Sequence, residues 1–337
     1  MLSGRLGENW GIQKMCEACQ SINEAPANKR IVINNILQFD PTRTLTLRKA
    51  FVADMDRRFN ALKRLIKTSI VGNDCFGLVT SATPFSALAA ATPGQFRFDR
   101  SAAKVEGFMK WLQEQEKVGV LELVQKSRIG APVEALWANV YIDTAYQRGI
   151  RRGREELRKQ GVDIPTFGSS QLRDPVIAAF NQPIHADRVG LIYSRVFSDL
   201  KGITSAMDTQ ISRVLAQGLA EGRNPRELAR VLIQTIDGKG EKLALTDTLG
   251  RYVPAQRRAQ MLARTEVVRA HHAANIQEYR NAGIEGVTVM AEWSTAGFKV
   301  CPVCIDFAKK GPYTLDEIEF MIPAHPACRC VAIPKVA

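Results

Sequence analysis

The chain has 337 residues, enough for two or three domains with a sizeable core, and its 45% hydrophobic and 24% charged residues exclude a disordered or fibrous protein. Lysine and arginine number 46 against 34 aspartates and glutamates, and the resulting net charge of +12 favours contact with a polyanion such as nucleic acid, or with an acidic protein surface. Met1 to Trp10 lack the apolar segment of a signal peptide, and no stretch reaches the roughly 18 apolar residues of a membrane span, so we expect no membrane association.

Residues 1–40 are expected to form an irregular N-terminal arm. Cys16 and Cys19 stand there with C-x-x-C spacing, but no second pair of ligands follows, because the next cysteine is Cys75. A fortuitous spacing is therefore favoured over a second metal site or a site between subunits. The odd number of cysteines, seven, argues against a complete disulfide framework, and synthesis in a reducing cytoplasm is expected.

Residues 41–80 are predicted to form a basic amphipathic helix that opens at Asp40-Pro41-Thr42-Arg43. Its apolar stripe steps by three and four residues through Val52, Met55, Phe59, Leu62, Ile66 and Ile70. Between these lie the candidate partner-binding cations Arg57, Arg58, Lys63, Arg64 and Lys67. Two interpretations stay open: a solvated helix face, or a surface for DNA phosphates or an acidic partner. Residues 81–94, rich in alanine, threonine and proline, are predicted to be a linker.

Residues 95–255 are predicted to form a helical body. One apolar face carries Phe108, Trp111 and Leu112, and a later helix carries Trp137, Tyr141, Ala145 and Tyr146, which we expect in the core rather than stacked on bases. That later helix continues into a second group of candidate partner-binding cations, Arg148, Arg151, Arg152 and Arg154, and Gly161 is expected to end it.

Another apolar stripe, Met207 to Gly218, ends near Gly222, and Asn224-Pro225 restarts the chain as a capped helix with Glu227 three residues past the cap. Two helices joined by a short glycine turn also fit a helix-turn-helix motif. An antiparallel helix pair is favoured, because such pairs are far commoner in helical proteins.

A helix over about residues 255–281 carries a face of small side chains, Ala263, Val267, Ala270 and Ala274, which permits a close helix neighbour. Arg264 and Glu266 are expected to form a buried polar network that braces the C-terminal module. His271 and His272 are adjacent and point about 100° apart, so they do not share an ion easily, and neither stands four residues from Glu266 as in H-E-x-x-H.

Residues 256–337 are predicted to form the C-terminal module. Val287, Val289, Ala291 and Trp293 alternate as in a strand, Cys328 to Ile333 form a second strand, and Thr314 to Glu317 form a capping box that opens a short helix. The predicted fold class is mainly α: a helical body with a small C-terminal α+β module, stapled by zinc or by cysteines.

Five metal-ligand side chains fall within thirty residues of this module: Cys301, Cys304, His325, Cys328 and Cys330. Thiolate sulfur and imidazole nitrogen are preferred ligands of tetrahedral Zn²⁺, which takes four of them. Cys301, Cys304, His325 and Cys328 are the favoured set, with Cys330 as a substitute for one of the last two. A disulfide or free thiols is the alternative. A structural site is expected, because Asp306, Asp316 and Glu317 fit helix ends and surface better than a catalytic base.

The order and spacing of these motifs resemble the C-terminal signature of phage minor head proteins, the head-morphogenesis family that includes protein F of phage Mu. The residues that carry the resemblance are Ala263-Arg264-Thr265-Glu266, Glu292-Trp293, Cys301-Pro302-x-Cys304 and Ile322-Pro323-x-His325-Pro326-x-Cys328-Arg329-Cys330. They cover about residues 260–332. The run from Trp137 to Gly149 resembles longer tailed-phage versions less specifically.

The resemblance implies a non-enzymatic virion protein, located at the portal or in the head interior after assembly in the host cytoplasm. Expected partners are the portal protein, the major capsid or scaffold protein, and double-stranded DNA. Arg264, Glu266 and Trp293 are expected to be structural. One alternative is a zinc-containing, non-specific DNA-binding protein outside any particle. A nuclease or hydrolase using Glu266, His271 or the Cys/His cluster is the weakest alternative.

Overall fold

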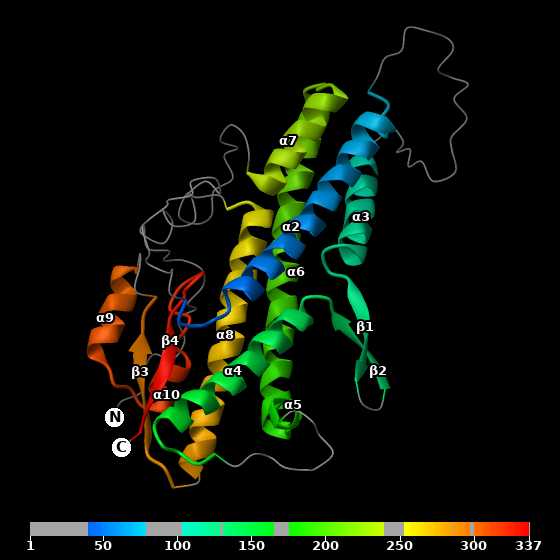
Figure 1. The fold of residues 1–337 in the computed structure, drawn as a ribbon. Coiled ribbons are helices and arrows are strands. Elements are labelled where there is room, and N and C mark those ends of the chain that lie inside the picture. The colour runs from blue at the N-terminus through cyan, green and yellow to red at the C-terminus, as the bar shows by residue number, and fades with distance from the viewer. Residues whose placement is uncertain are drawn as a thin grey trace, which may run out of the picture. The chain divides into compact units, whose positions relative to one another are not determined.

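The computed structural model describes residues 40–78, 103–128, 131–164, 175–238, 253–284, 286–296 and 300–336. Helices dominate these ranges, and the short strands form two pairs (Figure 1). The elements are α2 (Leu45–Lys67), η1 (Thr68–Gly72), α3 (Ala103–Val118), β1 (Leu123–Arg128), β2 (Ala131–Leu136), α4 (Asn139–Lys159), α5 (Pro175–Phe180), α6 (Pro183–Ala220), α7 (Pro225–Asp237), α8 (Ala255–Ile284), β3 (Val289–Ser294), α9 (Pro302–Lys310), α10 (Leu315–Glu319) and β4 (Val331–Val336).

The predicted fold class, mainly α with a small C-terminal α+β module, is confirmed. The hairpin of β1 and β2 was not predicted from the sequence. The predicted linker at residues 81–94, Cys16, Cys19 and all of the N-terminal arm except residue 40 lie outside the described residues. No helix in the described ranges has the length and apolarity needed to cross a membrane.

The described residues divide into two compact units, each assembled from separate stretches of chain. Unit 1 takes its residues from Met1–Lys49, Val140–Ile192 and Arg264–Ala337, and unit 2 takes its residues from Ala50–Asn139 and Tyr193–Ala263. The helices α2, α6 and α8 each contribute residues to both units. The Cys/His cluster belongs entirely to unit 1.

Unit 2 is built on the apolar stripe predicted in the first long helix. Met55, Phe59, Leu62 and Ile66 of α2 and Ile70 of η1 are buried. Val52 is only half-buried, and the preceding Phe51 is fully buried and packs edge-on against Trp137 at 5.7 Å between ring centroids. The predicted aromatic face of α3, with Phe108, Trp111 and Leu112, is buried in the same unit.

The turn between α6 and α7 has the predicted chemistry. Gly222 has a φ of +68°, a conformation that glycine adopts without steric cost. Asn224 then caps α7, and its side-chain oxygen accepts a hydrogen bond from the Glu227 backbone N–H at 2.9 Å. Gly218 lies so close to Leu228 that an added Cβ would stand 2.6 Å from its Cδ1. The missing side chain at Gly218 therefore permits the packing of these two helices.

Unit 1 is held together by a close approach of α4 to α8. A Cβ added at Gly149 would lie 2.3 Å from the His271 carbonyl oxygen and 2.6 Å from Ala274 Cβ. This confirms that the small face of α8 permits a close helix neighbour. The C-terminal module follows α8, and β3 and β4 pair antiparallel, with Val289 opposite Val336 and Ser294 opposite Val331 (Figure 1). The two predicted strands do pair, although the second begins at Val331, three residues later than predicted.

Candidate metal centre

The two cysteine-bearing segments of the C-terminal module meet in the core of unit 1. Cys301, Cys304, Cys328 and Cys330 are at most 3% exposed and pack in one hydrophobic cluster that also contains Trp293. Ligand atoms lie within 4.8 Å of one another in two groups, Cys301–Cys304–His325 and Cys304–Cys328–Cys330. Cys304 is common to both groups, so all five predicted ligands converge on one place.

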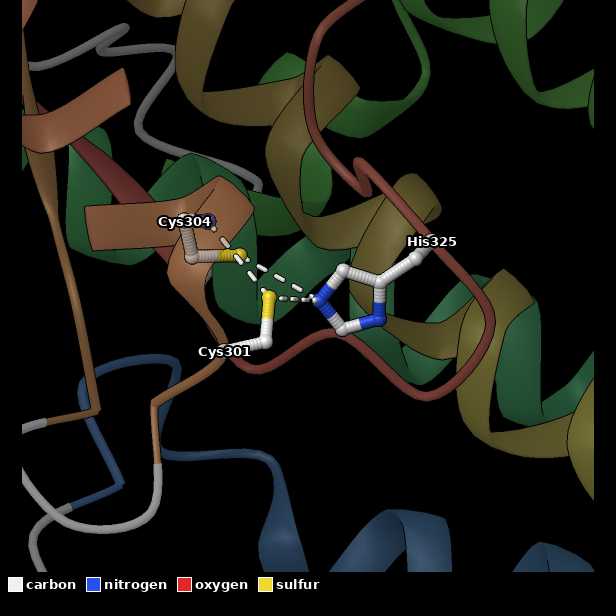
Figure 2. Close-up of side chains that lie close together, drawn as sticks. All are labelled: Cys301, Cys304 and His325. Carbon is white, nitrogen blue, oxygen red and sulfur yellow. Dashed lines mark hydrogen bonds between the residues drawn. The ribbon is translucent and has the colours of Figure 1, made fainter. Parts of the chain in front are cut away.

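The Cys301-Pro302-Val303-Cys304 segment aims two sulfurs the same way because it is the start of a helix. Cys301 is the N-cap of α9, in extended conformation, and Pro302 occupies the first helical position. The Cys301 sulfur accepts a hydrogen bond from the Cys304 backbone N–H at 3.4 Å. Figure 2 shows both sulfurs pointing toward Nε2 of His325. A C-x-x-C pair at a helix start thus provides two ligands on one side.

The returning segment supplies its ligands from a tight turn. The Cys328 backbone N–H donates to the His325 carbonyl at 3.1 Å, with Pro326 and Ala327 between them. Ala327 has a φ of +58°, as the third residue of a type II turn requires. Nδ1 of His325 lies 2.9 Å from the Pro326 carbonyl, so Nδ1–H donates there and the lone pair of Nε2 faces the sulfurs.

The distances agree with the edges of a tetrahedral metal site. His325 Nε2 lies 3.3 Å from Cys301 Sγ and 3.2 Å from Cys304 Sγ, and the sulfurs of Cys304 and Cys328 are 3.9 Å apart. With Zn–S bonds of ~2.3 Å and Zn–N bonds of ~2.0 Å, a tetrahedron has edges of roughly 3.8 Å between sulfurs and roughly 3.5 Å between nitrogen and sulfur. The donor set therefore fits Zn²⁺.

The disulfide alternative does not match this geometry. All five described cysteines, Cys75 among them, are unbridged, and the 3.9 Å between Cys304 and Cys328 is about twice a disulfide bond length of ~2.05 Å.

The cluster favours a thiolate at Cys328, whereas hydrogen bonding to Cys328 and burial raise the pKa of Cys304, and the pKa of Cys330 is raised to about 12. Hydrogen bonds from the Cys304 and Cys330 thiols, and the neighbouring His325, hold the pKa of Cys328 well below its usual value. Burial alone lowers the pKa of His325, but its hydrogen bond to Cys328 and the thiolate charge raise it to about 9. A cation bound here would take the place of the imidazole proton, so its binding would release protons and tighten as pH rises.

Three polar side chains of α8, seven residues apart, hold the module in place. The Thr265 hydroxyl accepts from the Ala327 backbone N–H at 2.9 Å, inside the ligand turn. Nε2 of His272 donates to the Ile318 carbonyl at 3.0 Å, and the Tyr279 hydroxyl donates to the Ala332 carbonyl at 3.1 Å. Residues seven apart lie on one helix face. These three roles were not predicted from the sequence, although the spacing of seven residues is visible in it.

Of the three residues predicted to be structural, Glu266 and Trp293 are buried and Arg264 is half-buried. Glu266 is buried, and its ion pair is with Arg269 at 3.0 Å. The predicted network between Glu266 and the half-buried Arg264 stays a prediction. Trp293 is 5% exposed, lies in the cluster core, and its ring centroid stands 5.0 Å from that of Phe307.

The adjacent histidines are buried and uncharged. Burial lowers the pKa of His271 to about 3 and that of His272 to about 4. Both side chains are 1% exposed, and His272 is occupied by its bond to Ile318. Their burial does not fit a general base that must reach a substrate.

The predicted basic surfaces are only partly exposed. Arg57, Arg64 and Lys67 of α2 and Arg148 and Arg151 of α4 lie at the surface. Arg58 instead stacks 4.1 Å over Trp137 and pairs with Glu122 at 2.6 Å, and Lys63 pairs with Asp237 at 3.0 Å. These contacts tie elements of unit 2 together.

The prediction of Arg152 and Arg154 as partner-binding residues is corrected. Arg152 is 6% exposed, donates to the Pro41 carbonyl and pairs with Glu156, and Arg154 is 3% exposed and pairs with Glu278 at 2.7 Å. They lie on the side of α4 that faces the core of unit 1, which a list of basic residues does not reveal.

The fold and the site define a mainly helical protein whose terminal α+β module encloses a cluster of four cysteines and one histidine with the donor types of a metal site. Residues 209–333 match the model of the family described as phage Mu protein F like protein, and this match supports assignment of the chain to a phage head-morphogenesis family. The match confirms the resemblance seen in the motifs and begins far upstream of Ala263, so it includes α7 and about the last third of α6. No curated protein and no solved structure matches the chain significantly.

Proposed function

We propose that the chain is a minor head protein of a tailed phage, which joins the portal and the head interior during procapsid assembly. The observation that carries the proposal is the family match over residues 209–333, together with the motif residues that converge in one module. In this proposal the protein is carried in the virion, assembles in the host cytoplasm, and is a structural component rather than an enzyme. The major capsid or scaffold protein is a further proposed partner.

The Cys/His cluster is proposed to bind one structural Zn²⁺ through Cys301, Cys304, His325 and Cys328, with Cys330 able to replace one of the last two. A metal with four protein ligands would join the two cysteine-bearing segments of the module. The protein's own residues orient the ligands: the start of α9 positions one pair, and the turn at Ala327 positions the other. The exposed cations of α2 support an additional contact with double-stranded DNA.

Sedimentation tests the assembly role. The protein is expected to co-sediment with procapsids and with the purified portal protein of the same phage. Its absence from both particles and assembly intermediates would contradict the proposal.

Metal analysis of freshly purified protein tests the site. About one zinc per chain is expected for the wild type and for Cys75→Ser, because Cys75 is buried outside the cluster. Cys304→Ser, which removes the sulfur common to both ligand groups, is expected to lose the metal. Equal zinc in Cys304→Ser and Cys75→Ser would contradict the proposed site.

A titration on duplex DNA at two salt concentrations distinguishes the proposed head protein from the alternative, a non-specific DNA-binding protein outside any particle. Affinity that falls steeply with salt, without binding to portal or heads, would favour it. Negligible affinity at low salt would remove it.

A further inference from the structure

An open groove in unit 2 lies between the end of α2, η1 and one face of α7. Its volume is about 520 Å³, within the range of protein ligand sites. Val71, Ala229 and Ile233 supply its apolar lining, and Lys67, Arg226 and Arg230 supply cations. The element η1 packs directly on α7, so the groove belongs to one compact unit.

The groove carries excess positive charge. The acidic residue in its lining, Asp237, pairs with Lys63 at 3.0 Å and both side chains are largely buried, so this carboxylate is already neutralised. Lys67, Arg226 and Arg230 are exposed. Arg226 and Arg230 stand four residues apart, on the same face of α7, in the first half of the helix. The partial positive charge of the α7 N-terminus adds to theirs.

The groove combines an apolar floor with neighbouring cations, and this combination suits duplex DNA and an acidic peptide to different degrees. A duplex contacts a protein surface mainly through phosphates and would gain little from Val71 and Ile233. A peptide with acidic side chains and one bulky apolar side chain satisfies both parts, because the apolar group covers the floor while the carboxylates meet the cations. The floor therefore favours a peptide.

We propose that this groove binds an acidic segment of the portal protein, with one large apolar side chain seated on Val71, Ala229 and Ile233. This inference rests on the proposed function, because it takes the portal as the protein that carries the segment. It assigns the contact to Arg226 and Arg230, which lie outside both groups of cations expected from the sequence.

Binding of the full-length chain to the purified portal protein of the same phage tests the inference. The variant Arg226→Glu/Arg230→Glu reverses two charges in the groove. The matched control Lys201→Glu/Arg213→Glu makes the same charge change on exposed residues of α6 in the same unit. We expect the groove variant to weaken portal binding at least about tenfold, and the control to change it less than about twofold. Thermal unfolding verifies that both variants are folded, and Arg226→Ala/Arg230→Ala replaces the first if it is not.

Ile233→Ser provides the second readout, since Ile233 is half-buried and uncharged. It is expected to weaken portal binding by about fivefold to tenfold and to leave binding to a duplex DNA oligonucleotide unchanged. Portal binding that survives every groove variant overturns the inference and leaves the proposed function intact. A wild-type chain that does not bind portal at all refutes the portal part of the proposed function itself. Loss of DNA binding alone in the groove variants also overturns the inference, because nucleic acid is then the occupant.

Discussion

The Thr265 hydroxyl accepts a hydrogen bond from the Ala327 backbone N–H at 2.9 Å, and this bond joins two motifs that are 62 residues apart in the chain. Thr265 belongs to the Ala-Arg-Thr-Glu motif of α8, and Ala327 lies between two proposed metal ligands. The threonine therefore fixes the turn that carries His325 and Cys328. The presence of both motifs in one chain has a physical meaning here, because Thr265 of the first motif positions the turn of the second.

Replacing Thr265 with valine keeps the shape of the side chain and removes the acceptor. The Ala327 N–H then loses its partner in a half-buried place, and we expect a loss of about 1–2 kcal/mol in the free energy of unfolding, together with weaker zinc binding. Denaturant unfolding and competition with a chromophoric chelator measure the two effects. Thr265→Ser keeps the hydroxyl and should stay close to the wild type. Identical behaviour of the valine and serine variants would show that the bond is unimportant.

Ala327 adopts a left-handed backbone conformation that disfavours side chains with branched Cβ. Ala327→Gly relieves this strain but adds freedom to the unfolded chain, so we expect stability between unchanged and about 1 kcal/mol higher. Ala327→Val is expected to be less stable than the wild type by more than about 1 kcal/mol. Thermal unfolding of the zinc-loaded proteins gives the order. A valine variant as stable as the glycine variant would contradict the turn geometry.

Much of this architecture was predictable from local patterns. The stripe from Met55 to Ile70 predicted a buried helix face, and Asn224-Pro225 predicted the start of α7, because such signals act within a few residues. The hairpin of β1 and β2 was not predicted, because Gln125 to Val133 show no clear alternation of apolar residues. Arg152 and Arg154 were misjudged because the side of α4 that is buried depends on Gly149 and its approach to α8.

The ligands of the candidate site were predictable from the sequence, but the residues of α8 that hold the ligand-bearing module in place were not. Five soft ligands in thirty residues identified the cluster, whereas Thr265, His272 and Tyr279 are ordinary residues of a largely buried helix. Their spacing of seven residues indicates a role only once the C-terminal module is known to lie along the face of α8 that carries them. Tertiary contacts of this kind leave little trace in a single sequence.

A buried pair of carboxyl groups in unit 2 predicts a loss of stability as pH rises from about 4.5 toward 9. Burial and the nearby Asp208 raise the pKa of Glu116 to about 9, and Glu116 hydrogen-bonds with Asp208. A carboxyl group whose pKa is raised by folding stabilises the protein fully below its unfolded pKa of about 4.5, and this contribution disappears as pH rises toward 9. The free energy of unfolding should fall by up to about 1.4 kcal/mol per pH unit across that window.

Glu116→Gln tests this prediction, because glutamine imitates the neutral acid and still donates to Asp208. The free energy of unfolding of this variant should change less than that of the wild type between roughly pH 5 and pH 9. Denaturant unfolding at several pH values measures the slope. Parallel curves for the two proteins would show that Glu116 does not hold its proton in the folded state. Glu114→Gln, at an exposed position two residues away on α3, is the matched control and should keep the wild-type slope.

The buried ion pair of Arg154 and Glu278 in unit 1 gives the last prediction. Both side chains are at most 3% exposed, and Nε2 of His185 lies 3.2 Å from the Glu278 carboxylate. The other ring nitrogen of His185, Nδ1, lies 3.1 Å from the Tyr146 hydroxyl, so His185 links Glu278 of α8 to Tyr146 of α4.

Glu278→Gln removes the charge that compensates Arg154 in the core, and we expect a loss of about 3–5 kcal/mol in the free energy of unfolding. The control Glu155→Gln breaks the pair with Arg43, whose side chains are 61% and 40% exposed, and should cost less than about 0.5 kcal/mol. Urea unfolding with the zinc content held constant compares them. Because Glu278 lies on the same helix as Thr265 and Tyr279, its loss should also weaken the support of the metal-binding turn. Equal stability of the two variants would mean that the buried network contributes little to holding α4 against α8.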